Sequence, residues 1–217
     1  MELIRTQARY LASFEEMHNI ISAGDAEKVF NIGDEILIEF EDYVVPYAVI
    51  GFDAEKTVDE KIEHTMTIWP TLAADDEAPF MPLPDADGRY NKWESSSLRK
   101  YLNSYEYYDH FLDMTEMLKY TCEVWKKNDD DRDTSDRFFI LSVGEMDPET
   151  EGHYPYFSSE KKRIIEDENG WTTAHWTRGA YRGYAYYTWY VYSAGYVTGG
   201  YAANAARLRN LLICAKR

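Results

Sequence analysis

Tyrosine, a side chain well suited to molecular contact, is concentrated in one short stretch near the end of this chain. Eight of the 25 residues from Ala180 to Asn204 are tyrosines, five are alanines and four are glycines. Tyrosine offers a large, stiff contact surface with a polar end at low cost in conformational entropy, and small residues around it set the shape of that surface. This mixture is typical of antibody paratopes, so the stretch is predicted to bind a ligand.

The residue types missing from this stretch also carry information. It contains no Glu, Lys, Gln or Met, although these four types make up 40 of the 217 residues of the chain. The residues present can all arise from an asparagine codon, AAC or AAT, by changes at its adenines alone, with Trp189 as the exception. These residues therefore have a common origin available to them in a single codon type.

Core packing is the competing interpretation of the tyrosines, since tyrosine is also favoured in strands. A strand buried on one face should alternate apolar and polar residues, yet residues 186–192 place aromatic rings on both faces. Both faces are not expected to be core in a chain of this size. At least one set of rings is therefore predicted to be exposed, which marks an interaction surface. We expect most of these rings, Tyr184, Tyr186, Tyr192 and Tyr196 among them, to be exposed on one continuous face, and Trp189 to be a buried core residue.

Motifs for catalysis or metal binding are not found in the sequence. Aspartates alternate over 128–133 as in a calcium loop, but Thr134 and Ile140 stand where an EF-hand needs Gly and Glu. The five histidines lack metal-ligand spacing, and His175 is expected to be packed or hydrogen-bonded rather than a base. We expect no catalytic residue, no metal and no cofactor.

Charge is divided unevenly along the chain. All 39 acidic residues lie at or before Glu168, and six cations without any acid follow. The net charge of −16 argues against nucleic-acid binding, which needs a basic footprint. The late cations are sparse and are expected to pair with the acidic body. They are Arg178, Arg182, Arg207, Arg209, Lys216 and Arg217.

Length and composition indicate one compact domain with an N-terminal extension, or at most two small units. No apolar run approaches the roughly 20 residues that span a membrane, and the first residues lack the layout of a signal peptide. Cys122 and Cys214 are too few for a disulfide framework and are expected to be buried thiols. We expect synthesis in the cytoplasm without a signal peptide, later release or association with a virion, and no membrane insertion.

The earlier part of the sequence predicts the elements that must position the tyrosines. Apolar residues at helical spacing over 6–22, ending near Gly24, predict an N-terminal helix that packs on the core or pairs with another subunit. Residues 36–40, 47–52 and 65–69 are typical of strands. Asp42 and Pro46 separate the first two of these strands, and residues 73–90 form a loop.

Two further helices are expected in the middle of the chain. Ser95 or Ser96 would begin the first. The second would follow a capping-box pattern at Asp113 and carry an apolar stripe that includes Cys122 and Trp125. Two later strands, over 138–143 and 211–215, would be separated by a loop-rich region. The mixture of elements indicates an α+β fold.

Several segments together resemble a known domain family. They are residues 30–34, 90–103, 134–145, 176–178 and 189–197. Their pattern is similar to an uncharacterised domain family common in gut bacteria and their prophages. Members resemble C-type lectin-like folds, and some serve as variable proteins of diversity-generating retroelements, in which a reverse transcriptase rewrites adenines near the end of the gene. The resemblance spans about residues 28–215.

The resemblance implies a C-type lectin-like fold with two helices, short antiparallel strands and long loops, plus an N-terminal helix. Residues 1–27 would be a helical extension and residues 28–217 the lectin-like domain, with a variable region of about 176–210. A fixed framework and a diversified ligand-binding surface would share that region. The framework would comprise Trp176, Arg178, Trp189, Val191, Gly195, Val197 and Arg207. The ligand-binding positions would be Tyr181, Arg182, Tyr184, Tyr186, Tyr187, Tyr190, Tyr192, Ser193, Tyr196, Thr198, Tyr201 and Asn204.

The ligand implied by such a surface is a protein or another cell-surface molecule. Two alternatives stay open. One is a structural or adhesion protein of a phage or cell surface that is not diversified. The other is an enzyme related to formylglycine-generating proteins, which would need an accessible, reactive cysteine.

Overall fold

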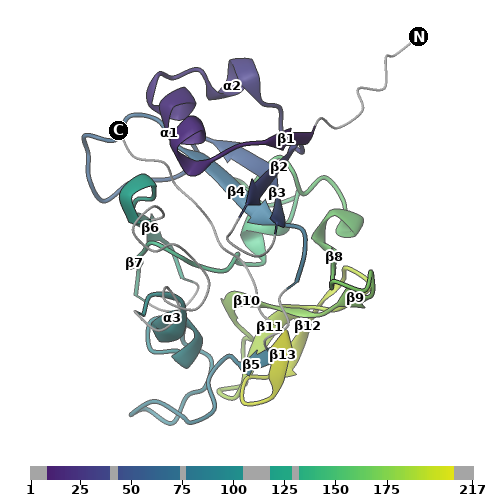
Figure 1. Cartoon of the computed structure of the whole chain (residues 1–217). Coiled ribbons are helices and arrows are strands. Elements are labelled where there is room, and N and C mark those ends of the chain that lie inside the picture. Colours follow the sequence, from purple (N-terminus) through teal and green to yellow (C-terminus); the bar gives the residue numbers. More distant parts are fainter. Residues whose placement is uncertain (1–8, 40–43, 74–76, 105–117, 129–131, 208–217) are drawn as a thin grey trace.

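The computed structural model describes residues 9–39, 44–73, 77–104, 118–128 and 132–207, which form an α+β fold of small sheets and short helices (Figure 1). One sheet has four strands in the order β1-β2-β3-β4, and another has three in the order β10-β11-β12. Two-stranded ladders join β5 to β13, β6 to β7 and β8 to β9. The two larger sheets lie at opposite ends of the molecule, with α1 and α2 beside the first (Figure 1).

The bounds of the elements are as follows. The strands are β1 (Arg9–Leu11), β2 (Glu35–Glu39), β3 (Val44–Phe52), β4 (Met66–Pro70), β5 (Glu77–Pro79), β6 (Val124–Lys126), β7 (Thr134–Asp136), β8 (Ile165–Glu166), β9 (Thr172–Thr173), β10 (His175–Ala180), β11 (Tyr187–Val191), β12 (Val197–Tyr201) and β13 (Ala205–Arg207). The helices are α1 (Phe14–Ser22), α2 (Ala26–Val29) and α3 (Ser97–Leu102), with two 3-10 turns, η1 (Gly144–Met146) and η2 (Glu160–Arg163).

The four-stranded sheet confirms the three strands predicted before residue 70. β2, β3 and β4 are antiparallel neighbours, and β1 adds in parallel to β2. Pro46, expected in a break between strands, instead lies within β3 opposite Leu37. The strand β5 also falls inside the segment predicted to be loop.

The N-terminal helix begins later than predicted because a capping box fixes its start. The Ser13 side chain accepts a hydrogen bond from the backbone of Glu16, whose carboxylate accepts one in return from the Ser13 backbone N–H. Residues 9–11, predicted as helix, are β1. Met17 and Ile21 are buried in the core, which confirms that this helix packs on the body of the protein.

Helix α3 confirms the first of the two central helices. Ser96 caps it by accepting a hydrogen bond from the backbone N–H of Arg99 at 3.0 Å. The second predicted helix is wrong at its end, because Trp125 lies in β6 and is 45% exposed. Its predicted start at Asp113 is outside the described residues. Cys122 is buried as expected.

The segment 138–141 is buried but is not the strand that its apolar sequence predicts. Its backbone groups find separate partners instead of a ladder. Asn103 Nδ2 donates to the Phe138 carbonyl at 2.8 Å, and the Arg178 N–H donates to the Leu141 carbonyl at 2.9 Å. Buried backbone groups need such partners wherever they lie. The final strand expected over 211–215, with Cys214, is outside the described residues.

A buried cluster of charged groups joins the three-stranded sheet to the rest of the fold. Arg178 of β10 donates to Glu145 of η1 at 2.9 Å, and Lys126 of β6 lies 3.1 Å from the same carboxylate. Lys126 also pairs with Glu55 at 2.6 Å, and the Tyr154 hydroxyl donates to Glu55. We call these five residues the buried charge cluster. It balances two cations against two carboxylates, and it confirms that Arg178 pairs with the acidic body.

The pKa values within the buried charge cluster follow from its charges. Burial alone raises the pKa of Glu145, but attraction by Arg178 and Lys126 outweighs burial and lowers it to about 2. Burial and the nearby Glu55 carboxylate raise the pKa of Tyr154 well above its usual value. Glu145 is therefore ionised and Tyr154 neutral at neutral pH.

We predict that Glu145→Gln destabilises the fold by about 3–5 kcal/mol, because the change leaves Arg178 without its only carboxylate partner among the described residues. Chemical denaturation at pH 7 measures the loss. Glu160→Gln is the matched control, since Glu160 is 67% exposed and lies 4.0 Å from Arg163. That control should change stability by less than about 0.5 kcal/mol. Equal effects of the two substitutions would contradict a stabilising role for the cluster.

A comparison of the parent protein with Glu145→Gln at different pH values gives a second prediction. The pKa of Glu145 in the fold, about 2, lies below its ordinary value of 4.5. Its contribution to stability is therefore fully present above pH 4.5 and is lost as the pH falls toward 2. Thermal melts from pH 7 to pH 2 should show the deficit of Glu145→Gln shrinking only below pH 4.5. A deficit that is constant over this range would argue against an ionised Glu145.

Candidate functional site

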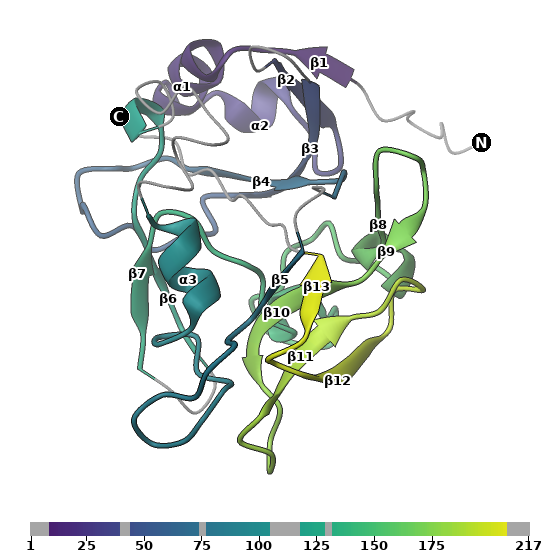
Figure 2. The ribbon, with the colours of Figure 1, turned by 60° about the horizontal axis from the view of Figure 1, so that its bottom comes forward.

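The tyrosine-rich stretch forms β11, β12 and the loops on either side of β11. β11 pairs with β10 on one side and with β12 on the other, and β12 is the outer strand of this sheet (Figure 2). Every residue of β10 is buried, whereas β12 has no buried residue. The burial of β10 anchors the sheet, and the loops and β12 carry the side chains that face solvent.

One group of rings surrounds the loop between β10 and β11. We call it the loop cluster, and its members are Tyr181, Tyr184, Tyr186, Tyr187, Trp189 and Tyr201. Tyr181 lies closest to Trp189, with ring centroids 4.3 Å apart. Tyr184, Tyr186 and Tyr201 are 53%, 42% and 43% exposed. The loop cluster is therefore a continuous aromatic surface that is open to solvent.

A second group of rings lies at the turn between β11 and β12. We call it the turn cluster, and it consists of Tyr190, Tyr192 and Tyr196. Tyr192 and Tyr196 stack at 5.0 Å, are 42% and 44% exposed, and Tyr190 bridges from Tyr192 to the buried ring of Trp176. Gly195 closes the turn at φ +93°, and its backbone lies so close to the Glu160 carbonyl that no side chain would fit.

Two glycines of β12 each lie against an aromatic ring, one from the loop cluster and one from the turn cluster. An added Cβ would lie 2.4 Å from the Tyr181 ring at Gly199 and 2.7 Å from the Tyr190 ring at Gly200. Neighbouring residues of a strand point to opposite faces. The two clusters therefore lie on opposite faces of the sheet, and aromatic rings cover glycines of an outer strand on both.

The exposure of the tyrosines is confirmed in part. Tyr184, Tyr186, Tyr192 and Tyr196 are exposed, as expected. The expectation of one continuous face is wrong, because β11 directs its rings to both sides. The expectation that Trp189 is a buried core residue is also wrong: it is half-buried, and its ring packs on Tyr181 at the surface. Trp176 is the buried tryptophan of this region, 3% exposed.

The other predicted positions lie around these clusters. Arg182 is exposed in the loop before β11, and Asn204 is exposed after β12. Ser193 and Thr198 are half-buried, the first in the turn and the second on β12 opposite Tyr190. Of the predicted framework, Trp176, Arg178, Val191 and Gly195 are buried, and Val197 is half-buried. The Arg207 side chain is outside the described residues.

Asn91 holds the loop of the loop cluster from a distant part of the chain. Its side-chain nitrogen donates to the carbonyls of Tyr184 and Tyr187, both at 2.9 Å, and the side chain is almost completely buried. The Tyr90 N–H donates to the Ala185 carbonyl at 2.7 Å. Asn91 is not among the predicted site residues. Its place in the segment 90–103 that carries the family resemblance is the signal that could have indicated a role in the site.

An open hollow of about 520 Å³ lies beside the loop cluster. It is lined by Arg89, Asn91, Ala180, Tyr181, Arg182, Gly183, Tyr184 and Ala185. Residues 180–185 form one side, and Arg89 and Asn91 contribute from the segment held against them. Arg89 was not predicted as a site residue. The hollow combines aromatic rings, hydrogen-bond donors and two positive charges, which suits recognition of a polar ligand.

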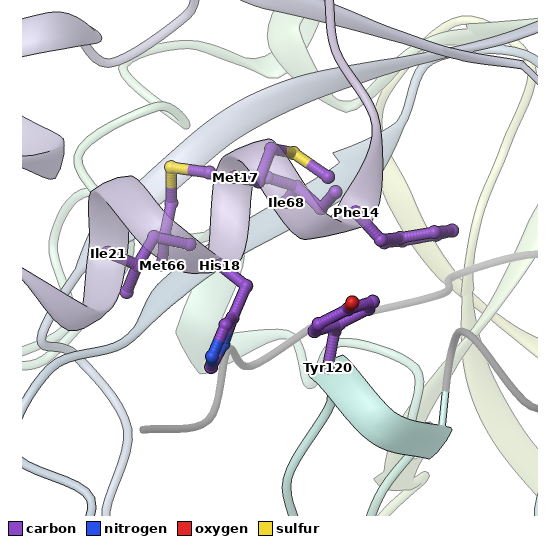
Figure 3. A pocket seen from close by; sticks show the side chains of 7 residues that line it. All are labelled: Phe14, Met17, His18, Ile21, Met66, Ile68 and Tyr120. Atoms are coloured by element: carbon purple, nitrogen blue, oxygen red, sulfur yellow. The ribbon is translucent and has the colours of Figure 1, made fainter.

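A second hollow lies between α1, β4 and Tyr120 (Figure 3). Phe14, Met17, His18 and Ile21 line it from the helix, together with Met66 and Ile68 from β4. Its volume is about 10 Å³, close to the roughly 10–15 Å³ that one water molecule occupies. It is a small gap in the apolar packing and not a ligand site.

His175, the histidine next to Trp176, is buried at the start of β10. Burial lowers the pKa of His175, whose Nε2 lies 3.0 Å from the Arg163 carbonyl. This confirms a packed, hydrogen-bonded histidine. No group of three metal-ligating side chains occurs in the part of the chain that the structure describes. Within the same residues, no helix has the length and apolar character to cross a bilayer.

Comparison with known proteins gives one family match. Residues 84–215, more than half of the chain, match the family described as Domain of unknown function (DUF6273). The matched region contains Arg89, Asn91 and the whole β10–β12 sheet. Neither a curated protein nor a solved structure matches the chain.

We predict that Gly199→Ala destabilises the protein by about 1–3 kcal/mol, because the new methyl group would overlap the Tyr181 ring. In a Tyr181→Ala background the same change should be neutral or slightly stabilising, since alanine is preferred to glycine within a strand by up to about 1 kcal/mol. Denaturation of the four proteins of this cycle measures the coupling. An equal effect of Gly199→Ala in both backgrounds would show that Tyr181 does not rest on Gly199.

Proposed function

The chain belongs to the DUF6273 family, and we propose that it is a ligand-binding protein whose Tyr-rich C-terminal surface is diversified by adenine-directed mutagenesis. In this proposal it is the variable protein of a diversity-generating retroelement, built on a C-type lectin-like fold, and it performs no catalysis. Its ligand is a protein or another cell-surface molecule. It needs no metal or cofactor.

The observation that carries the proposal is the exposure of aromatic rings on an anchored sheet. Five tyrosines of the two clusters are each more than 40% exposed, although large aromatic side chains usually contribute to cores. Their strands are fixed by the buried β10, by Asn91 and by the Gly195 turn. A rigid scaffold with exposed tyrosines binds ligands at low entropic cost.

Diversification is supported by the division between buried and exposed positions. Trp176, Arg178 and Val191 are buried and contact the body of the protein, so substitution there would disturb the fold. The exposed positions of the two clusters and their loops all hold residues of the adenine-derived alphabet. Many sequences could therefore occupy the surface without loss of the scaffold. Ala180, Gly199 and Gly200 are constrained by burial or by ring contacts and are not expected to vary freely.

An enzymatic function of the formylglycine-generating type would need an accessible cysteine. Among the described residues, Cys122 is 4% exposed and lies in the core, which favours binding over such chemistry at this cysteine, and Cys214 lies outside the described residues. A structural or adhesion protein without diversification would use the same exposed tyrosines. The two binding interpretations differ in the history of the gene, not in the geometry of the surface.

We predict that replacing Tyr184, Tyr186, Tyr192 and Tyr196 together by Ala leaves thermal stability nearly unchanged, because surface substitutions each alter stability by about 0.5 kcal/mol or less. The same variant should lose binding to intact gut-bacterial cells and to arrays of purified bacterial surface proteins. Tyrosine anchors can each contribute about 2 kcal/mol or more to binding. Flow cytometry and array fluorescence measure the loss.

Trp176→Ala and Trp189→Ala are the controls for these substitutions. Trp176 is buried, so its loss should destabilise the fold by about 3–5 kcal/mol. Trp189 is half-buried at the surface, so its replacement by Ala should lower the free energy of unfolding by about 1 kcal/mol. If the four-tyrosine variant melts as low as Trp176→Ala, or if it binds like the parent protein, the proposed binding surface is wrong.

The diversification itself is tested at the DNA level. We expect a reverse-transcriptase gene near this gene, together with a near-copy of codons 176–210 that differs from them only at adenines. Sequencing of many isolates should show substitutions at the exposed tyrosine codons and not at those of Trp176 or Arg178. If the gene has neither these neighbours nor these substitutions, the hypothesis of diversification is wrong. The hypothesis of a binding surface would not be affected.

A further inference from the structure

We propose that the hollow beside the loop cluster binds a carboxylate group of a protein ligand, an aspartate or glutamate side chain held between Arg89 and Arg182. This inference rests on the proposed binding function and names the chemistry that one part of the surface recognises. It also extends the site beyond the tyrosine-rich segment, because Arg89 precedes that segment by about 90 residues.

The two arginines reach the hollow from separate segments of the chain, each held by its own hydrogen bonds. The Arg89 N–H donates to Asp85 Oδ1 at 2.8 Å, and its Nε donates to Asn91 Oδ1 at 3.3 Å. Arg182 is carried by the loop whose carbonyls accept hydrogen bonds from Asn91. Asn91 therefore orients the Arg89 side chain and fixes the Arg182 loop at the same time.

The Arg89 guanidinium keeps donors for a ligand. Within the described residues, Nε is the only side-chain nitrogen of Arg89 with a hydrogen-bond partner. A guanidinium presents its remaining N–H groups in a planar fork that matches the two oxygens of a carboxylate. Tyr181 and Tyr184 also line the hollow, and a tyrosine hydroxyl group is a donor from which a carboxylate can accept a hydrogen bond.

The charge of the hollow is opposite to that of the whole protein. The chain has a net charge of −16, yet none of the described residues lining the hollow is acidic. The nearest acids in sequence, Asp85 and Asp87, pair with Lys92 at 3.5 and 2.7 Å. The two arginines that line this hollow offer a local site for an anion on a protein of net charge −16.

The lining favours a carboxylate on a protein rather than a bare anion. Two aromatic rings border the hollow and continue into the loop cluster. Arginine and tyrosine together are the residues that most often carry the binding energy of protein interfaces. A peptide can place its carboxylate in the hollow while its neighbouring residues lie against the exposed rings.

The test uses the full-length protein and small fragments of known chemistry. N-acetyl-glutamate N-methylamide is titrated while the Nε–Hε signals of the arginines are followed by ¹H–¹⁵N NMR, and N-acetyl-glutamine N-methylamide is the uncharged match. We expect the glutamate fragment to shift the Arg89 and Arg182 signals with a Kd on the order of 1 mM, and the glutamine fragment to leave them in place. Arg89→Gln and Arg182→Gln should each weaken binding about tenfold.

Lys161→Gln is the matched control, since Lys161 is exposed in η2 and its loss changes the net charge by the same amount. It should leave the titration unchanged. Equal shifts with glutamate and glutamine, or equal weakening by Lys161→Gln and Arg89→Gln, would overturn the proposal. The methyl glycoside of N-acetylneuraminic acid is the third arm, and binding of this sugar acid without binding of glutamate would also overturn it. Loss of cell binding in the four-tyrosine variant is measured separately, so a failed titration leaves the proposed function intact.

Discussion

The buried charge cluster is the interaction on which the placement of the three-stranded sheet and its exposed aromatic rings depends. Arg178 is the point where β10 meets the body: its guanidinium bonds Glu145 at 2.9 Å and the Ile140 carbonyl at 2.6 Å. Lys126 extends the cluster to Glu55. Buried charges are costly unless all are paired, and these four balance one another. The pairing links β10, β6 and η1 through buried groups, so displacement of any of the three would leave a buried charge unpaired.

Small side chains and backbone contacts then shape the surface that β10 supports. Gly199 and Gly200 leave room for rings on both faces of β12, and the Gly195 turn rests on the Glu160 backbone. Asn91 pins the loop before β11 from outside the sheet. These constraints act on the backbone. The exposed tyrosine side chains are therefore not needed to hold the strands in place. A surface of this kind can change its residues while the strands stay in place.

The segments that carry the family resemblance mostly build the fold. Trp93 and Arg99 both donate to the buried carboxylate of Asp136, at 2.9 and 2.6 Å, and Asn103 holds the backbone of Phe138. These contacts give residues of the segments 90–103 and 134–145 a structural role in the core of the fold. The exposed rings lie instead on the loops and on β12, so membership of the family indicates the scaffold and not a ligand.

The sequence by itself determined helix α3, through its N-cap serine, and the strands β2, β3 and β4, through their apolar runs. It also determined the exposure of Tyr184, Tyr186, Tyr192 and Tyr196, and the pairing of Arg178 with the acidic body. These features depend on neighbours in the chain or on composition. The tertiary structure alone decided that Trp189 is half-buried, that the rings divide between two faces, and that Arg89 and Asn91 join the site. Alternation along β11 shows which side chains share a face, but only the packing of distant segments decides which face is covered. The hollow likewise exists because hydrogen bonds from Asn91 bring together residues that lie about 90 positions apart.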